Sequence, residues 1–423
     1  MGPREHELGQ PSGPTSDATE SAAAALGLSS DARGVLASQH LRRAIDAGMI
    51  DAGPYKIQPA SVQPASLDLH LGEVAFRIRC SFLPDDSRVE VKLKDLVIDE
   101  VDLRRDGAVL ETKRPYLVPL VEELDLPDTI RGKANPKSST GRLDVFTRVI
   151  TDNSHRFDEI TPGYRGKLFL EVVPLSFTVK VRQGLSLNQL RLVAGRPQLS
   201  DDEIRELHAR EPILARGNQP VTDRGLTLAD GLFLGLDLRG DDDRRVGYRA
   251  KEHAEVLEMS RDGYYGPDTY WEPVHSEPGD RIVLSPDRFY LLLSDESVRI
   301  PPAYAAEMTA YDPTSGELRT HYAGFFDPGF GYDPEGRFLG SRAALEVRAH
   351  DVPFMIENGQ KVCKLTFERM IEEPDVLYGS DIGSSYQTQV DTLSKHFRRR
   401  VPRSEPPPTV PGELPGLFEG SGT

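Results

Sequence analysis

Short apolar runs separated by turn residues dominate the middle of the chain. Segments such as 115–120 (PYLVPL), 167–175 (KLFLEVVPL), 289–294 (FYLLLS) and 361–370 (KVCKLTFERM) are bounded by Gly, Pro, Asp and Asn. Strands this short and this closely spaced by turns are typical of sandwiches or barrels rather than of alternating strand–helix units. The pattern therefore predicts a mainly β protein.

Apolar residues at helical spacing occur in two places. Residues 34–50 (GVLASQHLRRAIDAGMI) and residues 200–210 (SDDEIRELHAR) both predict a helix, the second with acidic residues in its first turn. Residues 1–32 show no period, and residues 401–423 are too rich in proline for a helix or a central strand. Both ends are therefore predicted to be disordered tails.

A set of short motifs occurs twice in the same order, about 170 residues apart. Each set contains a Leu-Asp-Leu triplet, a Pro-x-Ser-x-x-x-Arg segment, a Pro-Gly turn followed by an aromatic residue, and a Leu-Glu pair. This internal duplication predicts two tandem domains of one fold, of the β-barrel or jelly-roll type, with a few short helices. We divide the chain into a tail (1–32), a first repeat with its N-terminal helix (33–214), a second repeat (215–375), a further segment (376–400) and a Pro-rich tail (401–423).

Composition narrows the classes of partner. Lys and Arg total 51 against 67 Asp and Glu, and the net charge of −16 disfavours a nucleic-acid polymer as ligand. Two cysteines, Cys80 and Cys363, make no disulfide framework and suggest a reducing compartment. We find no signal-peptide pattern and no run of the ~18–20 apolar residues that cross a bilayer. These features predict a cytoplasmic protein without a membrane partner.

A small cluster of positive and hydroxyl side chains occupies residues 137–142 (KSSTGR). If these residues begin a helix or a tight loop, their amides and hydroxyls converge on an anion, and Arg142 adds a charge-assisted contact. A capped turn without a ligand is the alternative, because such turns are common.

Glu171 lies in a predicted strand. Lys167, Phe169 and Glu171 share one face of that strand, and Leu168 and Leu170 share the other. A carboxylate that points into an apolar wall has its pKa raised toward neutral and can act as a general base or acid. The alternative is a surface glutamate on an edge strand.

Together these motifs resemble the dCTP deaminase and trimeric dUTPase superfamily, and within it the duplicated bacterial form of the dCTP deaminase branch. The segments that carry the resemblance are 64–72 (PASLDLHLG), 137–142 (KSSTGR), 162–171 (PGYRGKLFLE), 323–330 (AGFFDPGF), and Tyr378 with 385–389 (SYQTQ). The second resembles the family motif R/K-S-S-x-x-x-R with one residue fewer before the arginine. The third and fourth resemble its motif D-P-G-[WF]-x-G-x-[IL]-x-L-E, and the last resembles the segment that closes over the nucleotide.

The resemblance implies hydrolytic deamination of dCTP to dUTP and ammonia, in the synthesis of deoxynucleotide precursors, with a glutamate base and no catalytic metal. It implies that a strand glutamate acts as base and that a serine and an arginine hold the water and offset charge at C4; the candidates are Glu346, Glu171, Ser138, Arg142, Ser315 and Arg319. The nucleotide-binding candidates are Lys137, Ser139, Asp158, Asp327, Tyr378, Tyr386, Gln387 and Gln389. Mg²⁺ is expected on the substrate triphosphate, and zinc is not expected.

Sites of this superfamily form between domains, which makes a composite site the preferred hypothesis. In it, Ser138, Ser139 and Arg142 face Glu346. The converse pairing, in which Ser315 and Arg319 face Glu171, is expected to be a second or a degenerate site. Three tandem pairs make a closed set of six domains, so a homotrimer or a larger homo-oligomer is expected.

Two other features suggest chemistry that we set aside. His253-Ala254-Glu255 spells the H-x-E of zinc cytidine deaminases, but the required P-C-x-x-C is missing, since Cys363 is the only cysteine downstream. The aromatic run at 264–271 (YYGPDTYW) could stack on a base, but we expect it to pack against protein surfaces.

Two alternative functions stay open. A dUTPase, or a bifunctional enzyme that also hydrolyses dUTP, would need an aspartate base near the sugar, for which Asp158 or Asp327 is available. A non-catalytic nucleotide-binding protein on the same fold is the other alternative. The expected ligand is dCTP, with dUTP or dTTP as further candidates.

Overall fold

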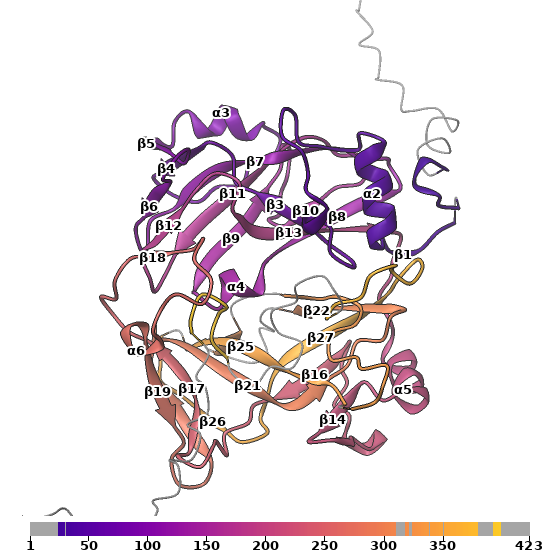
Figure 1. Ribbon diagram of the computed structural model, residues 1–423, viewed down its shortest axis with the longest axis vertical. Helices are drawn as coiled ribbons and strands as arrows, with labels where there is room; N and C mark the ends of the chain where they lie inside the picture. Colours follow the sequence, from indigo (N-terminus) through magenta and orange to yellow (C-terminus); the bar gives the residue numbers. More distant parts are fainter. Residues whose placement is uncertain are drawn as a thin grey trace, which may run out of the picture.

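The computed structural model describes residues 24–29, 31–309, 318–320, 324–337, 339–349, 351–379 and 392–398, with 309 and 318–320 described by their backbone alone. The predicted C-terminal tail lies outside these ranges, as do residues 1–23 and 30 of the predicted N-terminal tail. Residues 24–29 are described, and there the prediction of disorder is wrong: Leu26 is buried in the first core, and its carbonyl accepts from Arg43 Nη1 at 3.0 Å. The chain forms two β domains, drawn one above the other in Figure 1, with a few short helices. This confirms the predicted fold class.

Two sheets enclose the core of the first domain. The first sheet consists of β1 (Gly34–Val35), β3 (Leu67–His70), β8 (Ile130–Pro136), β10 (Glu159–Ile160) and β13 (Ser186–Ala194). The second consists of β2 (Ile50–Asp51), β4 (Val74–Ile78), β5 (Val97–Asp102), β7 (Tyr116–Asp125), β9 (Val145–Ile150) and β11 (Arg165–Pro174). A smaller sheet joins β6 (Ala108–Leu110), β12 (Val179–Val181) and β18 (Leu257–Glu258). Alternate apolar residues of both large sheets, such as Leu190 and Leu170, meet in one core.

The second domain is built in the same way. One sheet consists of β16 (Leu232–Gly235), β22 (Tyr304–Thr309), β24 (Phe325–Phe326) and β27 (Lys361–Arg369). The other consists of β14 (Leu214–Arg216), β15 (Gln219–Pro220), β17 (Arg245–Ala250), β19 (Trp271–His275), β21 (Phe289–Val298), β23 (Leu318–Thr320) and β25 (Ser341–Ala349). A two-stranded antiparallel sheet is formed by β20 (Arg281–Leu284) and β26 (Phe354–Glu357). Residues such as Leu365 and Leu345 meet in the second core.

The helices are short and lie around the sheets. They are α2 (Ser38–Asp46), α3 (Val89–Leu93), α4 (Ser138–Gly141), α5 (Asp201–Arg210) and α6 (Pro267–Tyr270), with 3-10 turns η1 (Pro59–Ser61) and η2 (Asp223–Gly225). The helix predicted at 200–210 is confirmed by α5, and the helix predicted at 34–50 is confirmed only over α2, because Gly34–Val35 and Ile50–Asp51 pair as strands β1 and β2. Among the described residues, none of the helices combines the length and the apolar character that crossing a bilayer requires.

Helix α5 belongs to the second domain, whereas the division drawn from the sequence placed it with the first repeat. Ile204 and Leu207 of this helix are buried in the second core, and β14 pairs with β21 of the second domain. Ser200 caps the helix by accepting from the Glu203 amide, and the Glu203 carboxylate accepts from the Ser200 amide. The second domain therefore begins before residue 215.

The order of strand pairing is the same in both domains. In the first domain β4 pairs with β7, β7 with β11 and β11 with β9; in the second β17 pairs with β21, β21 with β25 and β25 with β23. The other sheets run β3-β13-β8-β10 and β16-β27-β22-β24. The strands β11 and β25 thus hold equivalent places, and Glu171 and Glu346 lie on them. Descent by duplication stays a prediction from the sequence.

The outer face of the second domain's β17–β21–β25 sheet is covered by the first domain. Tyr248, Phe289 and Leu291 of this face belong to the same apolar cluster as the first-domain core. Figure 1 shows α4 at the boundary between the two domains, next to β25. Polar groups of β25 on this face are consequently buried between the domains.

Candidate active site

Strand β25 sends a glutamate and an arginine out of the second core toward the first domain. Leu345 and Val347 lie in the second core, so Glu346 and Arg348 face the opposite side of the sheet. They are nevertheless only 7% and 8% exposed, because the first domain covers this face. Leu291 of β21 pairs directly with Glu346 and lies in the apolar interdomain cluster.

Helix α4 brings a positive charge to this carboxyl. The helix follows Lys137 and ends at Gly141, and the buried Arg142 caps its C-terminus. Burial raises the pKa of Glu346 to about 7, against an opposing effect of the Arg142 charge and with a smaller upward contribution from Asp144. The structure thus brings together Arg142 and Glu346, the central pair of the composite site expected from the sequence.

An ion pair between Arg348 and Asp144 involves neighbours of Glu346 and Arg142 in the chain. Arg348 donates to the Asp144 carboxylate and to the carbonyl of Asp287. The Ser176 hydroxyl also donates to the Asp144 carboxylate. Asp144 adopts a left-handed backbone conformation with φ 57°, which short polar residues tolerate better than most. These three contacts fix the carboxylate and guanidinium of this pair.

The serines of α4 differ in their surroundings. Ser138 is exposed at the start of the helix, whereas Ser139 is buried. The Lys137 ammonium forms an ion pair with the Asp68 carboxylate of β3. Ser138 is therefore the hydroxyl of this motif that solvent reaches.

Residues 392–398 lie against α4. Arg142 Nη1 donates to the carbonyl of Thr392 at 3.3 Å, and the Ser394 hydroxyl donates to the carbonyl of Ser139 at 2.9 Å. Burial lowers the pKa of His396 to about 4, so this histidine is neutral in the contact. The end of the described chain thus touches the helix that carries Arg142.

The aromatic run at 264–271 holds this segment in place. The ring centroid of Phe397 lies 5.5 Å from that of Tyr270 and 5.9 Å from that of Trp271. The ring centroid of Phe177, in the first domain, lies 5.2 Å from that of Trp271. The prediction that these aromatic residues pack protein surfaces is confirmed.

The first-domain glutamate has different neighbours. Glu171 faces away from the first core, as its alternation predicted, and Arg148 of β9 pairs with it across the sheet. Arg148 Nη2 donates to Glu171 Oε1 at 2.6 Å, and its guanidinium stacks 3.7 Å above the ring of Phe157. Apolar residues around Phe169 and α3 cover this face. Glu171 is thus a buried partner of Arg148 in the same domain.

The two aspartate candidates make internal contacts. Asp158 accepts from the Val149 amide at 2.7 Å, and burial raises its pKa to about 7. Asp327 accepts from Arg191 at 2.9 Å and from the Ser66 hydroxyl at 3.2 Å, in a buried contact between the domains. Burial raises the pKa of Asp327 as well, against the Arg191 charge. Neither carboxylate has a described contact with the Glu346 site.

Tyr378 lies on the second Pro-Gly turn. Its amide donates to the Pro328 carbonyl at 2.8 Å, and its ring contacts Phe330 at a centroid distance of 5.7 Å. Arg319 is described by its backbone alone and pairs with Arg348 between β23 and β25. Ser315, Tyr386, Gln387 and Gln389 lie outside the described residues.

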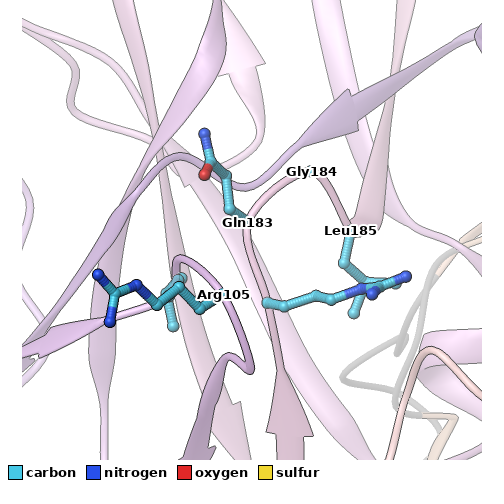
Figure 2. Close-up of a pocket in the computed structure, with 6 residues that line it drawn as sticks. Arg105, Gln183, Gly184 and Leu185 are labelled. Carbon is cyan, nitrogen blue, oxygen red and sulfur yellow. The ribbon is translucent and has the colours of Figure 1, made fainter.

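One pocket borders the interdomain site, and a second lies away from it in the first domain. One, of about 250 Å³, is lined in part by Tyr248, Arg342 and Thr392; Tyr248 pairs with Leu291, the neighbour of Glu346, so this pocket borders the site. The other, of about 330 Å³, lies in the first domain (Figure 2). There Arg105 points away from Leu185, so the pocket lacks a convergent positive cradle.

The comparisons with known proteins agree with this architecture. The family model of the 2'-deoxycytidine 5'-triphosphate deaminase (DCD) N-terminal domain matches residues 32–196, and that of the C-terminal domain matches residues 200–397. The crystal structure of 2'-deoxycytidine 5'-triphosphate deaminase from Agrobacterium tumefaciens is similar, with 44% identity, a TM-score of 0.76, and coverage of 81% of this chain and 100% of that chain. The chain belongs to the dCTP deaminase family.

Curated members of the dCTP deaminase family match one part of the chain. A "dCTP deaminase, dUMP-forming" of Methanobrevibacter smithii is 27% identical over 163 residues, which are 36% of this chain and 79% of that protein. Its namesake from Halobacterium salinarum is 29% identical over 135 residues, 31% of this chain and 64% of that protein. These proteins are thus similar to a stretch about as long as one domain.

Sequence reasoning missed two charged residues of the interdomain site. Asp144 and Arg348 were not singled out, although each follows a candidate by two positions. The signal was present as complementary charge order, Arg-x-Asp at 142–144 and Glu-x-Arg at 346–348. The converse segments, Arg-x-His at 319–321 and Glu-x-Val at 171–173, lack it.

Proposed function

We propose that this protein deaminates dCTP to dUTP and ammonia, with Glu346 as general base. The observation that carries the proposal is the buried Glu346 carboxyl, whose pKa is raised to about 7 next to Arg142. A group with a pKa near the working pH accepts a proton readily and returns it readily. Membership of the dCTP deaminase family supports the same reaction.

In the proposed reaction, water attacks C4 of the cytosine ring while Glu346 accepts one of its protons. Glu346 returns that proton, so that one proton ends on ring N3 and the other on the departing amine. The C4–N4 bond breaks, ammonia leaves, and the oxygen of the water becomes the uracil carbonyl. One water is consumed for each ammonia released.

Arg142 and Ser138 would assist this step. The Arg142 charge lies against Glu346 and would stabilise negative charge that develops during the attack. The exposed Ser138 hydroxyl at the start of α4 would hold the water. Lys137 and Ser139 would contact the triphosphate of the substrate, which we take to be the Mg²⁺ complex of dCTP.

The proposal is tested by incubating the full chain with dCTP in a zinc-free Mg²⁺ buffer. We expect the absorbance change from cytosine to uracil together with release of ammonia in equal amount, and no loss of rate with a zinc-selective chelator. The Glu346→Gln variant is the control for a contaminating deaminase. Binding of dCTP without turnover would instead favour the non-catalytic alternative.

A bifunctional reaction that continues to dUMP is the second candidate. The observation that favours it is the description "dUMP-forming" of two similar proteins. Chromatography of the products distinguishes the two reactions, because the bifunctional enzyme releases dUMP and pyrophosphate. An accumulation of dUTP at the rate of ammonia release would exclude it.

We further propose that the protein acts in the cytoplasm as a homotrimer or a larger homo-oligomer. Arg142 and Glu346 belong to one chain, so the central pair of the site needs no neighbouring chain to form. Light scattering of the purified protein measures the assembly. A monomer that is fully active would remove the oligomer from the proposal and leave the chemistry intact.

A further inference from the structure

The interdomain site contains two pairs of opposite charges in reversed order, of which Asp144–Arg348 is an ion pair and Arg142–Glu346 interacts through its charges. Arg142 and Asp144 come from the end of α4 and the loop after it, and Glu346 and Arg348 come from one face of β25. Arg142 acts on Glu346, and Arg348 donates to Asp144. Each domain therefore contributes one positive and one negative group, two residues apart, in complementary order.

All four groups are shielded from water, so only arrangements that pair their charges are favourable. Asp144 is fully buried, and the three others are at most 8% exposed. A buried charge is costly unless it is paired and hydrogen-bonded. With two positive and two negative groups, a shift of the loop along β25 would break both pairs at once. The interdomain position of Glu346 is therefore fixed more firmly than one pair would fix it.

The second pair is itself held in place from outside. Arg348 also donates to the carbonyl of Asp287, and the Ser176 hydroxyl also donates to Asp144. Asp287 belongs to the second domain and Ser176 to the first. The Asp144–Arg348 pair thus has hydrogen bonds to a backbone carbonyl of the second domain and to a hydroxyl of the first. Glu346 lies on the same face of β25 as Arg348.

We propose that Asp144 and Arg348 are positioning residues for the reaction: they hold the Arg142 guanidinium and the Glu346 carboxyl in register across the domain interface and balance their charges. This inference rests on the proposed function, because it gives Glu346 its role. It explains why the pairing of 142–144 with 346–348 carries the complementary charge order, which the segments 319–321 and 171–173 lack.

The charge balance makes the two residues act in opposite directions on Glu346. The negative charge of Asp144 raises the pKa of Glu346, so removing it lowers that pKa. Removing Arg348 takes away the guanidinium that donates to the Asp144 carboxylate, so the negative charge of Asp144 is less balanced and raises the pKa of Glu346 further. The other titratable or charged groups near Glu346 are Arg142 from α4, Tyr248 in the same row of the sheet and Cys363 from β27, and the variants leave them unchanged.

The test compares Asp144→Asn, Arg348→Gln and Arg348→Lys with the wild type, using the pH dependence of kcat on dCTP. Asparagine suits the left-handed backbone at 144, and lysine keeps the charge at 348. We expect Asp144→Asn to move the acidic limb of kcat to lower pH and Arg348→Gln to move it to higher pH. Both should lower kcat by about tenfold or more through misplacement of Glu346, and Arg348→Lys should restore the limb.

Glu368→Gln is the matched control, because Glu368 is also a buried interdomain carboxylate paired with an arginine, Arg191, at 3.1 Å. It should lower the melting temperature and leave the acidic limb in place. Wild-type limbs and kcat values in both Asp144→Asn and Arg348→Gln would overturn the inference, as would shifts in the same direction.

A wild type that does not turn over dCTP would refute the proposed function separately. In that case Glu346 protonation is reported by the part of the pH dependence of the melting temperature that the Glu346→Gln variant removes, since Asp158 also titrates near pH 7. If Asp144 and Arg348 are positioning residues, Asp144→Asn and Arg348→Gln should shift the midpoint pH of this transition in opposite directions. An unchanged midpoint pH in both variants would overturn the inference.

Discussion

Glu171 and Glu346 occupy equivalent strands with the same pairing order, yet they have different neighbours. Each faces away from the core of its own domain, and each pairs with a leucine, Leu117 or Leu291, on the neighbouring strand. Glu171 is bonded to Arg148 of its own domain, whereas Glu346 meets Arg142 of the other domain. Equivalent strand positions thus provide a buried carboxyl in both domains. The neighbouring charged residue, which differs between the domains, sets the electrostatic environment of each carboxyl.

The largest effect is expected from the two glutamates themselves. Glu346→Gln should lower kcat on dCTP by roughly 10²–10⁴-fold, the usual contribution of a general base. Glu171→Gln should lower kcat far less, because the Glu171 carboxylate is paired with Arg148 of the same domain. Steady-state assays of both variants at pH 7.5 make the test, with melting curves to show that both fold. Equal decreases in kcat for the two variants would contradict the assignment of different roles to Glu346 and Glu171.

The next effect concerns the two arginines. Arg142→Met removes the positive charge that lies against Glu346, and we expect kcat to fall by about 10²-fold or more. Arg148→Met serves as the matched variant in the first domain, where kcat should stay close to the wild type. Measured kcat values that fall equally in both variants would show that the first-domain pair also takes part.

Arg148→Met is instead expected to lower stability. It leaves the Glu171 carboxylate buried without its partner, which costs on the order of 3 kcal/mol in the free energy of unfolding. Urea denaturation measures the loss. The double variant Arg148→Met with Glu171→Leu should recover most of it, because no unpaired charge is then left. A single variant as stable as the wild type would contradict the structural role of the pair.

The smallest effect is a pH dependence of stability. The pKa of Glu346 is raised from 4.5 to about 7, so its protonated form stabilises the fold below pH 4.5 and this contribution is lost as the pH rises to 7. The loss is at most on the order of 3 kcal/mol. Asp158 contributes in the same direction in the first domain, with a pKa of about 7.

The two carboxyls can be separated by their glutamine and asparagine variants. Glu346→Gln and Asp158→Asn should each flatten part of the fall in unfolding free energy between pH 4.5 and 7, and the double variant should flatten more than either. Chemical denaturation at several pH values provides the measurement. An unchanged slope in the double variant would mean that other groups carry the pH dependence.

Particular elements show how far the sequence reached. Short apolar runs between turn residues predicted the strands that became β7, β11, β21 and β27, and helical spacing with acidic residues in the first turn predicted α5. The placement of α5 was missed, because a helix that follows one domain and precedes another has an apolar face that fits either core. The use of Asp327 in an interdomain contact with Arg191 was also missed, since the two lie far apart in the chain.

The sequence by itself determined the fold class, the family and the candidate groups, because these depend on local periodicity and on short motifs. It preferred the pairing of Arg142 with Glu346 and kept the converse pairing with Glu171 as a second or degenerate site. Only the tertiary structure shows the neighbours of each glutamate, with the Arg142 charge acting on Glu346 and Arg148 paired with Glu171. Burial and partner charge are properties of that packing, and they set the pKa and the accessibility on which the chemistry depends.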